Sequence, residues 1–371
     1  MSSSQAPITQ NSNITPPSSF ANHPLTPPPT DEKQFAQVHR VIALFEEIRA
    51  GRHITRHPWT EFQLAEGDYD EIERQFERDE VLSGYVKDKI RYDYSRESDR
   101  LVVRMSTAVH ELFIARVEDA IFSQLKSIRE ESGDAAAFAQ KVYPARSTEV
   151  YFPVDDARSA TKSKREPDTS FWHDDAKYPG VIIEVAYSHK RKRLGRLAED
   201  YLLDSNASVQ VVVGLDIEYG KKRSRKATLS VWRTHVDGNE LRAVQEVADE
   251  VFRNEQGHPT EHPGLRLQLS DFANKELALR KSRDKDREIV ITSQQLCEYL
   301  DAAETKVARV ESLSEGSIAP GLKKRKRAET PPDQITPGDE AKYVGQEERA
   351  AKRMAEDDPE YEDMSIKSSS E

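Results

Sequence analysis

Hydrophobic residues recur at three- and four-residue steps in several parts of the chain. Residues with this spacing lie on one face of a helix, so each such stretch predicts an amphipathic helix. The longest stripe runs from Val102 to Ile128 and includes Val109, Val117 and Leu125. The predicted helices span residues 35–48, 67–78, 102–128, 194–202 and 293–310.

Runs rich in valine, isoleucine and aromatic residues, bounded by turn-forming residues, predict β-strands. A basic turn over residues 220–226 separates two of these runs and predicts a hairpin, and the last run is expected to be an edge strand. The predicted strands span residues 148–153, 168–172, 181–188, 209–217, 227–233 and 265–269. With the helices, this gives a core of helix, three strands, helix and two strands, an α/β arrangement.

Composition divides the 371-residue chain into four parts. Residues 1–30 are rich in Ser, Thr and Pro, and such a segment cannot bury enough apolar surface to offset the entropy of ordering it. Residues 31–100 form a predicted helical extension packed on the core, which spans residues 101–310. Residues 311–371 combine a basic cluster with an acidic end and, like the N-terminal tail, are expected to be disordered.

Charge and cysteine content exclude several classes of protein. Cys297 is the single cysteine, so an intramolecular disulfide and a cysteine-built zinc site are excluded, and a reducing, intracellular compartment is expected. No apolar run is long enough to cross a membrane, so we expect no membrane partner. The net charge of -11 argues against a uniformly basic nucleic-acid coat, although an average over the chain hides local basic patches.

Two acidic residues stand out because of the strands that carry them. Asp168 follows Pro167 at the start of one predicted strand, and Glu184 lies inside the apolar run of the next. A buried carboxylate costs several kcal/mol unless it is paired, protonated or bound to a metal ion. One explanation is a divalent cation, Mg²⁺ or Mn²⁺, shared by the two carboxylates. The alternative is that each acid is satisfied by a nearby arginine, lysine or backbone amide.

This combination resembles the PD-(D/E)XK, or restriction-endonuclease-like, superfamily, and in particular its Uma2-like and fungal nuclease-like branches. The resemblance covers roughly residues 101–233 and is carried by the Pro-Asp pair, by Glu184 within its strand, and by the following Val-Ala-Tyr-Ser sequence. It implies that Asp168 and Glu184 are catalytic metal ligands and that the Val185 carbonyl completes the metal shell. It also implies a ligand role for Glu111 on the long helix, which otherwise is a solvated acid on a helix face.

One residue departs from the pattern of the superfamily. Ala186 stands where the superfamily has a lysine that orients the attacking water and neutralises charge on the phosphate. Some branches place this base on the following helix, where Lys190, Lys192 and Arg196 are candidates. Lys190 and Arg196 are the residues expected to take part in catalysis, although an arginine stays protonated and can only clamp a phosphate.

The resemblance implies a metal-dependent nuclease that hydrolyses phosphodiester bonds of nucleic acid, with DNA favoured over RNA. Lys190, Arg191, Lys192 and Arg193 are expected to contact phosphates, although a charge run can also be a solvated surface. Because Ala186 removes a catalytic group, whether the protein is an enzyme stays open. The alternatives are an inactive member that binds nucleic acid or protein, and an unrelated α+β scaffold.

The basic run Lys323–Arg327 has the composition of a nuclear-localisation signal. It predicts an import receptor as a partner and a nuclear or nucleo-cytoplasmic location. Unstructured contact with nucleic acid is the competing interpretation of the same run. The sequence shows no coiled-coil repeat and leaves the oligomeric state open.

Overall fold

A computed structural model of the chain describes residues 35–53, 59–153, 162–187, 191–218, 224–281, 286–312 and 337–357. The chain divides into two compact units, residues 1–312 and 313–371. The first unit contains the sheets of the described structure and is mixed α/β, as the sequence predicted, but with several sheets rather than one core sheet. Lys190 and the run Lys323–Arg327, both given roles by the sequence, lie outside the described residues.

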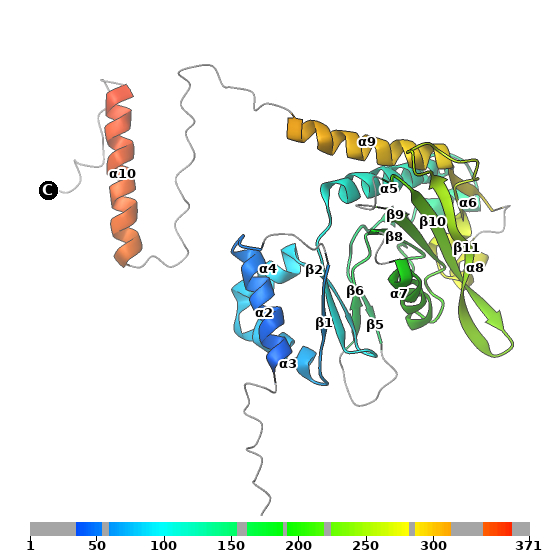
Figure 1. Ribbon diagram of the computed structural model, residues 1–371, viewed down its shortest axis with the longest axis horizontal. Helices are drawn as coiled ribbons and strands as arrows, with labels where there is room; N and C mark the ends of the chain where they lie inside the picture. The colour runs from blue at the N-terminus through cyan, green and yellow to red at the C-terminus, as the bar shows by residue number, and fades with distance from the viewer. Residues whose placement is uncertain are drawn as a thin grey trace, which may run out of the picture. The chain divides into compact units, whose positions relative to one another are not determined.

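The N-terminal part of the first unit is built on an antiparallel sheet with a hydrophobic cluster of its own. Its strand order is β1-β3-β2-β6-β5, and its core is a cluster of buried side chains between Val38 and Val103. Helices α2, α3 and α4 contribute to this cluster beside β1, β2 and β3 (Figure 1). The bounds of these elements are α2 Ala36–Arg49, β1 Trp59–Gln63, α3 Asp68–Arg78, α4 Glu80–Lys89, β2 Arg91–Ser95, β3 Arg100–Arg104, β5 Val150–Phe152 and β6 Ser163–Arg165.

The second sheet has six strands in the order β11-β10-β9-β8-β7-β4. Strands β8 and β9 are parallel and are connected through α7, whereas the other neighbouring strands are antiparallel. A parallel pair requires such a crossover because the chain must return to the same end of the sheet. The bounds are β4 Val142–Pro144, β7 Thr169–His173, β8 Val181–Tyr187, α7 Arg191–Asp204, β9 Val211–Ile217, β10 Ala227–Asp237 and β11 Glu240–Arg253.

Alternate residues of β8 belong to different hydrophobic clusters, one on each face of the second sheet. Ile183 and Val185 pack in the cluster of α5 (Ala108–Arg129). Ile182 and Ala186 pack in the cluster that contains Ala198 and Leu202 of α7. Because side chains alternate along a strand, Glu184 lies on the α7 face.

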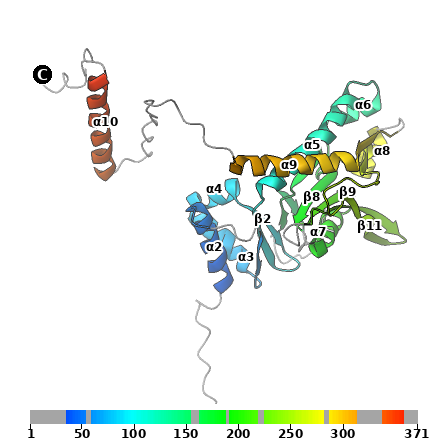
Figure 2. The same ribbon diagram turned by 45° about the horizontal axis from the view of Figure 1, so that its top comes forward.

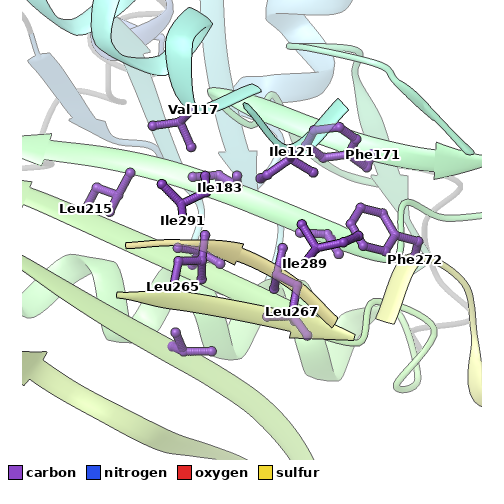
Figure 3. Packing of buried hydrophobic residues seen from close by; sticks show 14 of the residues in the cluster. Val117, Ile121, Phe171, Ile183, Leu215, Leu265, Leu267, Phe272, Ile289 and Ile291 are labelled. Atoms are coloured by element: carbon purple, nitrogen blue, oxygen red, sulfur yellow. The ribbon is translucent and has the colours of Figure 1, made fainter. Parts of the chain in front are cut away.

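A small antiparallel pair, β12 (Leu265–Gln268) with β13 (Glu288–Ile291), covers the α5 face of the second sheet. Figure 3 shows Leu265 and Ile291 from this pair in one cluster with Val117 and Ile121 of α5 and with Ile183. Helix α9 packs beside α5 (Figure 2). The remaining elements of this unit are α6 Asp134–Ala139, the 3₁₀ helix η3 Leu269–Phe272, α8 Lys275–Lys281 and α9 Ser293–Ser312.

The structure differs from the sequence prediction at several elements. The long helix begins at Ala108, because Val102 belongs to strand β3 rather than to the helical stripe. Residues 163–165, which lie outside the predicted strands, form the buried strand β6. The run 265–269 pairs with β13 in a separate sheet instead of extending the main one. Strand β11 is an element that the sequence did not predict.

The second unit contains α10 (Pro337–Asp357), a helix that the sequence analysis did not predict. Among the described residues of both units, no helix is long and apolar enough to span a membrane.

Candidate functional site

Asp168 immediately precedes β7, Glu184 lies on the neighbouring strand β8, and their carboxylates converge. Strands β7 and β8 pair antiparallel with Thr169 opposite Ile183, which places Asp168 next to Glu184 in the adjoining register position. Both side chains are buried, with 5% and 3% of their surface exposed. The carboxylates converge on Arg104, whose Nη1 is 2.8 Å from Glu184 Oε2 and 3.7 Å from Asp168 Oδ1.

Three further donors hold the Asp168 carboxylate. Arg91 Nη2 donates to Oδ1 at 2.8 Å. The backbone N–H of Val185 donates to Oδ2 at 2.7 Å, and His110 Nε2 lies 3.0 Å from the same oxygen. Both oxygens of Asp168 are therefore satisfied by groups of the protein.

Glu184 is likewise satisfied at both oxygens. Tyr201 of α7 donates its hydroxyl to Oε1 at 2.7 Å, and Arg104 Nη1 donates to Oε2 at 2.8 Å. Asp93 of β2 lies on the other side of the same guanidinium, with Oδ1 accepting from Arg104 Nη2 at 3.2 Å and Oδ2 lying 3.1 Å from Nε. Arg104 thus contacts three carboxylates at once.

The pKa values of the site follow from burial and from these charges. Burial raises the pKa of Glu184 to about 8, helped by the neighbouring charges of Asp168 and Asp93 and opposed by Arg104. Burial acts in the same direction on Asp168, but His110, Arg104 and Arg91 outweigh it and hold the pKa of Asp168 well below its usual value. Asp168 is therefore the stronger acid of the two and Glu184 the weaker.

His110 is the titratable base of the site. Burial lowers the pKa of His110, but the charge of Asp168 and the hydrogen bonds to Asp168 and Glu111 outweigh this effect and raise it to about 9. The imidazole is consequently charged near neutral pH and forms an ion pair with Asp168. Its position is fixed by the first turn of α5, where the Thr107 side chain accepts the His110 backbone N–H at 3.3 Å.

This donor set does not fit the divalent cation expected from the sequence. Each of the four oxygens of Asp168 and Glu184 already accepts a hydrogen bond from the protein. Arg104 in addition lies between the two carboxylates. No cluster of three or more histidine, cysteine, aspartate or glutamate side chains in the described residues is arranged to hold a metal ion. In this arrangement the acids are satisfied by arginines, a tyrosine, a histidine and a backbone amide.

Glu111 and Val185, the other two expected metal ligands, have different contacts. The Glu111 side chain is 55% exposed, with Oε1 at 3.8 Å from Arg91 Nη1 and 3.5 Å from His110 Nδ1. It is therefore linked to Asp168 through two cationic groups. Val185 contributes its backbone N–H to Asp168.

The residues expected to supply a catalytic base or phosphate contacts lie on or before α7. Ala186 is buried among apolar residues of the α7 face. Arg196 is exposed on α7. Arg191, Lys192 and Arg193 form the first turn of this helix, but their side chains, like all of Lys190, are outside the described residues. In the described part of the chain, the cations that contact Asp168 or Glu184 are Arg91, Arg104 and His110, with no lysine among them.

The partners of the two acids were not predicted from the sequence. Arg104 is 80 residues from Glu184 in the chain, and Arg91 and Asp93 lie in a strand whose sequence stands out only for its aromatic residues. Tyr201 fits the apolar stripe of a helix, which conceals its polar role. A usable signal existed at His110, since a histidine beside Glu111 on an apolar helix is a polar group that requires a partner when buried.

A separate cavity of about 820 Å³ lies between helices α3 and α4 and the first sheet. Lys164 lies in its wall, almost fully buried, with Nζ at 2.7 Å from both Glu149 and Glu166 and 3.6 Å from the centre of the Tyr92 ring. Its charged lining is balanced between four acids and four cations, namely Asp70, Glu73, Glu77, Glu149, Arg74, Lys87, Lys162 and Lys164. The charges of the lining therefore favour neither an anionic nor a cationic ligand.

No protein-family profile matches the chain, and no curated protein matches its sequence.

Proposed function

We propose that this chain is a restriction-endonuclease-like protein that binds nucleic acid without hydrolysing it. The observation that carries this proposal is the saturation of Asp168 and Glu184, whose four oxygens are all engaged by donors of the protein. This corresponds to an inactive member of the superfamily that the sequence resembles.

The order of elements supports the relation to that superfamily. Helix α5 precedes β4, β7 and β8, and α7 connects β8 to the parallel strand β9. Asp168, just before β7, lies beside Glu184 of β8, as the resemblance implies for a pair of metal-binding acids. The two smaller strands β5 and β6, which pair in the first sheet, are inserted between β4 and β7.

Hydrolysis would require groups that the described residues of this site do not offer. A metal-dependent nuclease uses its cation to polarise the phosphoryl oxygen and to lower the pKa of the attacking water. Here a cation would have to displace Arg104 from Glu184, which would leave a buried guanidinium without one of its partners. The lysine that would orient the water is replaced by Ala186, which is packed among apolar side chains.

Binding depends on groups outside this acidic cluster. The run Lys190–Arg193 leads into α7, and Arg196 is exposed one turn further along the same helix. Lysine and arginine bind phosphates without regard to sequence and release counterions when they do so, so the affinity falls as salt rises. We therefore expect weak, salt-dependent and sequence-independent binding, with DNA preferred over RNA.

The first test measures cleavage and binding in parallel on the full chain. Labelled single- and double-stranded DNA and RNA are incubated with Mg²⁺ or Mn²⁺ and analysed for products, and binding is followed by fluorescence anisotropy over a range of salt concentrations. We expect no products and a binding constant that falls with salt. Metal-dependent cleavage that disappears in Glu184→Gln would overturn the proposal in favour of the metal-dependent nuclease.

A matched pair of variants locates the binding surface. Replacement of Lys190, Arg191, Lys192 and Arg193 by glutamine is expected to reduce the slope of log affinity against log salt by about 0.9 for each phosphate of duplex DNA that the variant no longer neutralises. The control replaces the same number of exposed cations in the N-terminal part of the chain, Arg40, Arg49, Arg52 and Lys89. Equal reductions in both variants would contradict a binding surface at α7, and absence of binding at low salt would contradict the nucleic-acid partner altogether.

A further inference from the structure

We infer that Arg104 is a built-in cation that takes the place of a divalent metal ion, so that the native protein binds no metal there and loss of this side chain opens a metal site. The inference rests on the proposed relation to metal-dependent nucleases, and it concerns the same acidic site.

The position of the guanidinium supports this substitution. Its Nη1 lies within 2.8 Å of Glu184 and 3.7 Å of Asp168, the two acids that the resemblance assigns to the metal. Asp93 contacts the opposite side of the same group through Nη2 and Nε. One positive group is therefore in contact with three carboxylates, as a shared cation would be.

The fold delivers Arg104 to this position and holds it there. Arg104 is the last residue of β3, the strand that lies between β1 and β2 in the first sheet, and its register partner on β2 is Arg91. The two arginines are therefore cross-strand neighbours that approach Asp168 together. Only 9% of the Arg104 side chain is exposed, so it is a fixed part of the interior rather than a mobile surface group.

A divalent cation and the guanidinium cannot share the site. Both would be positive charges within a few ångströms of each other in a buried environment where water screens poorly, and their repulsion would be strong. When the guanidinium is removed, Glu184 Oε2 and both oxygens of Asp93 lose a positive neighbour, whereas Asp168 Oδ1 still accepts a hydrogen bond from Arg91 Nη2. The carboxylates of Glu184 and Asp93, with Asp168 beside them, then face the vacated volume as oxygen donors that suit Mn²⁺ and Mg²⁺.

The test measures Mn²⁺ binding by electron paramagnetic resonance, in which the signal of free Mn²⁺ disappears on binding. It compares the full-length native chain with Arg104→Ala and with the control Arg100→Ala, which removes an arginine from the same strand that pairs with Glu61 at a partly exposed position. We expect signal loss in Arg104→Ala alone. Adding Glu184→Gln to Arg104→Ala should abolish the signal loss.

Thermal unfolding provides a second readout without any activity. Because a ligand that binds the folded state raises the melting temperature, Mn²⁺ should raise it for Arg104→Ala and leave the native chain and Arg100→Ala unchanged. Arg104→Lys keeps a positive charge in the site, and we expect it to exclude Mn²⁺ as the native chain does. Folding of each variant is checked by circular dichroism.

Two results would overturn the inference. One is Mn²⁺ binding by the native chain that is lost in Glu184→Gln, a measurement that stands even if Arg104→Ala does not fold. The other is a folded Arg104→Ala that binds no Mn²⁺. Neither result depends on nucleic acid, so failure of DNA binding would refute the proposed function and leave this inference intact, whereas Mn²⁺ binding by the native chain without cleavage would refute this inference alone.

Discussion

At the residue scale, the hydroxyl of Tyr201 satisfies one oxygen of Glu184 in a fully buried setting. Tyr201→Phe removes this donor and leaves a buried carboxyl oxygen unpaired, so we expect the free energy of unfolding to fall by about 1 to 2 kcal/mol. Urea denaturation at neutral pH measures the change. Tyr143→Phe is the control, because Tyr143 is exposed and its loss should change stability by less than about 0.5 kcal/mol. Equal effects of the two substitutions would contradict the assigned hydrogen bond.

His110 should make stability depend on alkaline pH. Its pKa is raised from 6.5 to about 9 in the folded protein, so its stabilising contribution is complete below pH 6.5 and is lost as the pH rises through about 9. The pKa of Glu184 is also raised, to about 8, so its stabilising contribution is likewise lost as the pH rises, but over a lower pH range than that of His110. Between the two pKa values of His110, at about pH 7 to 8.5, the loss from His110 should therefore approach about 1.4 kcal/mol per pH unit.

The pH prediction is checked by urea unfolding of the native chain, of His110→Gln and of the control His39→Gln at pH values from about 6 to about 9.5, which span the two pKa values of His110. His110→Gln should remove most of the decline above pH 8, and His39→Gln, which changes an exposed residue of α2, should retain it. Parallel curves for the native chain and His110→Gln would show that His110 is not charged in the folded state.

The same residues show what the sequence could predict of the site. The adjacency of Asp168 and Glu184 followed from two short strands joined by a turn, because local pairing of this kind is encoded within about 20 residues. Their partners could not be predicted in this way, since Arg91, Arg104 and His110 come from another sheet and from the start of α5. The sequence allowed both a metal ion and an arginine as the compensating charge, and geometry alone distinguishes them.

At the scale of elements, Gly180 lies where the β7–β8 connection passes against η3. Its carbonyl accepts the backbone N–H of Gln210, and a Cβ at this position would collide with backbone atoms of Asp271 and Phe272. Because backbone cannot move aside as a side-chain end can, Gly180→Ala should destabilise the fold by about 1 to 3 kcal/mol.

Gly84 in α4 is the control, because a side chain there has free space, and thermal or urea unfolding measures the stability of both variants. A Cβ there meets nothing within 4 Å, and alanine loses less backbone entropy than glycine on forming a helix. Gly84→Ala should therefore stabilise the protein by about 0.5 to 1 kcal/mol. Destabilisation of similar size by both substitutions would show that the packing of Gly180 against η3 is not what constrains it.

Elements with one buried face were predicted correctly, whereas elements whose secondary structure depends on tertiary contacts were missed. The stripes of α2, α3, α5, α7 and α9 and the apolar runs of β8 and β9 are strongly patterned, and all were predicted. Strand β3 was wrongly predicted as part of helix α5, because Val102 and Met105 fit the helical spacing of its hydrophobic residues. Most of β11 is exposed or half-buried and polar, so only its pairing with β10 makes it a strand.

At the scale of the whole molecule, buried charges connect hydrophobic clusters that otherwise have separate members. One cluster belongs to the first sheet and its helices, and the other clusters flank the second sheet. Arg104 and Arg91 link the first sheet to Glu184 and Asp168, and Arg165 of β6 reaches Asp200 of α7 at 2.6 Å. The ion pairs around Asp168 and Glu184 therefore also connect the first sheet to the second sheet within this unit.

We propose that a nuclear import receptor binds the basic run Lys323–Arg327 and that this run sets the cellular location of the protein. Five consecutive positive charges in a chain of net charge -11 are a distinct local feature that a receptor can bind. Replacing all five by alanine in a fluorescently tagged full chain should abolish nuclear accumulation. The control replaces Lys221, Lys222 and Arg223, a second basic run, and should leave accumulation unchanged. Loss of nuclear signal in both variants would instead indicate retention by binding to nucleic acid, because either basic run could contribute to that.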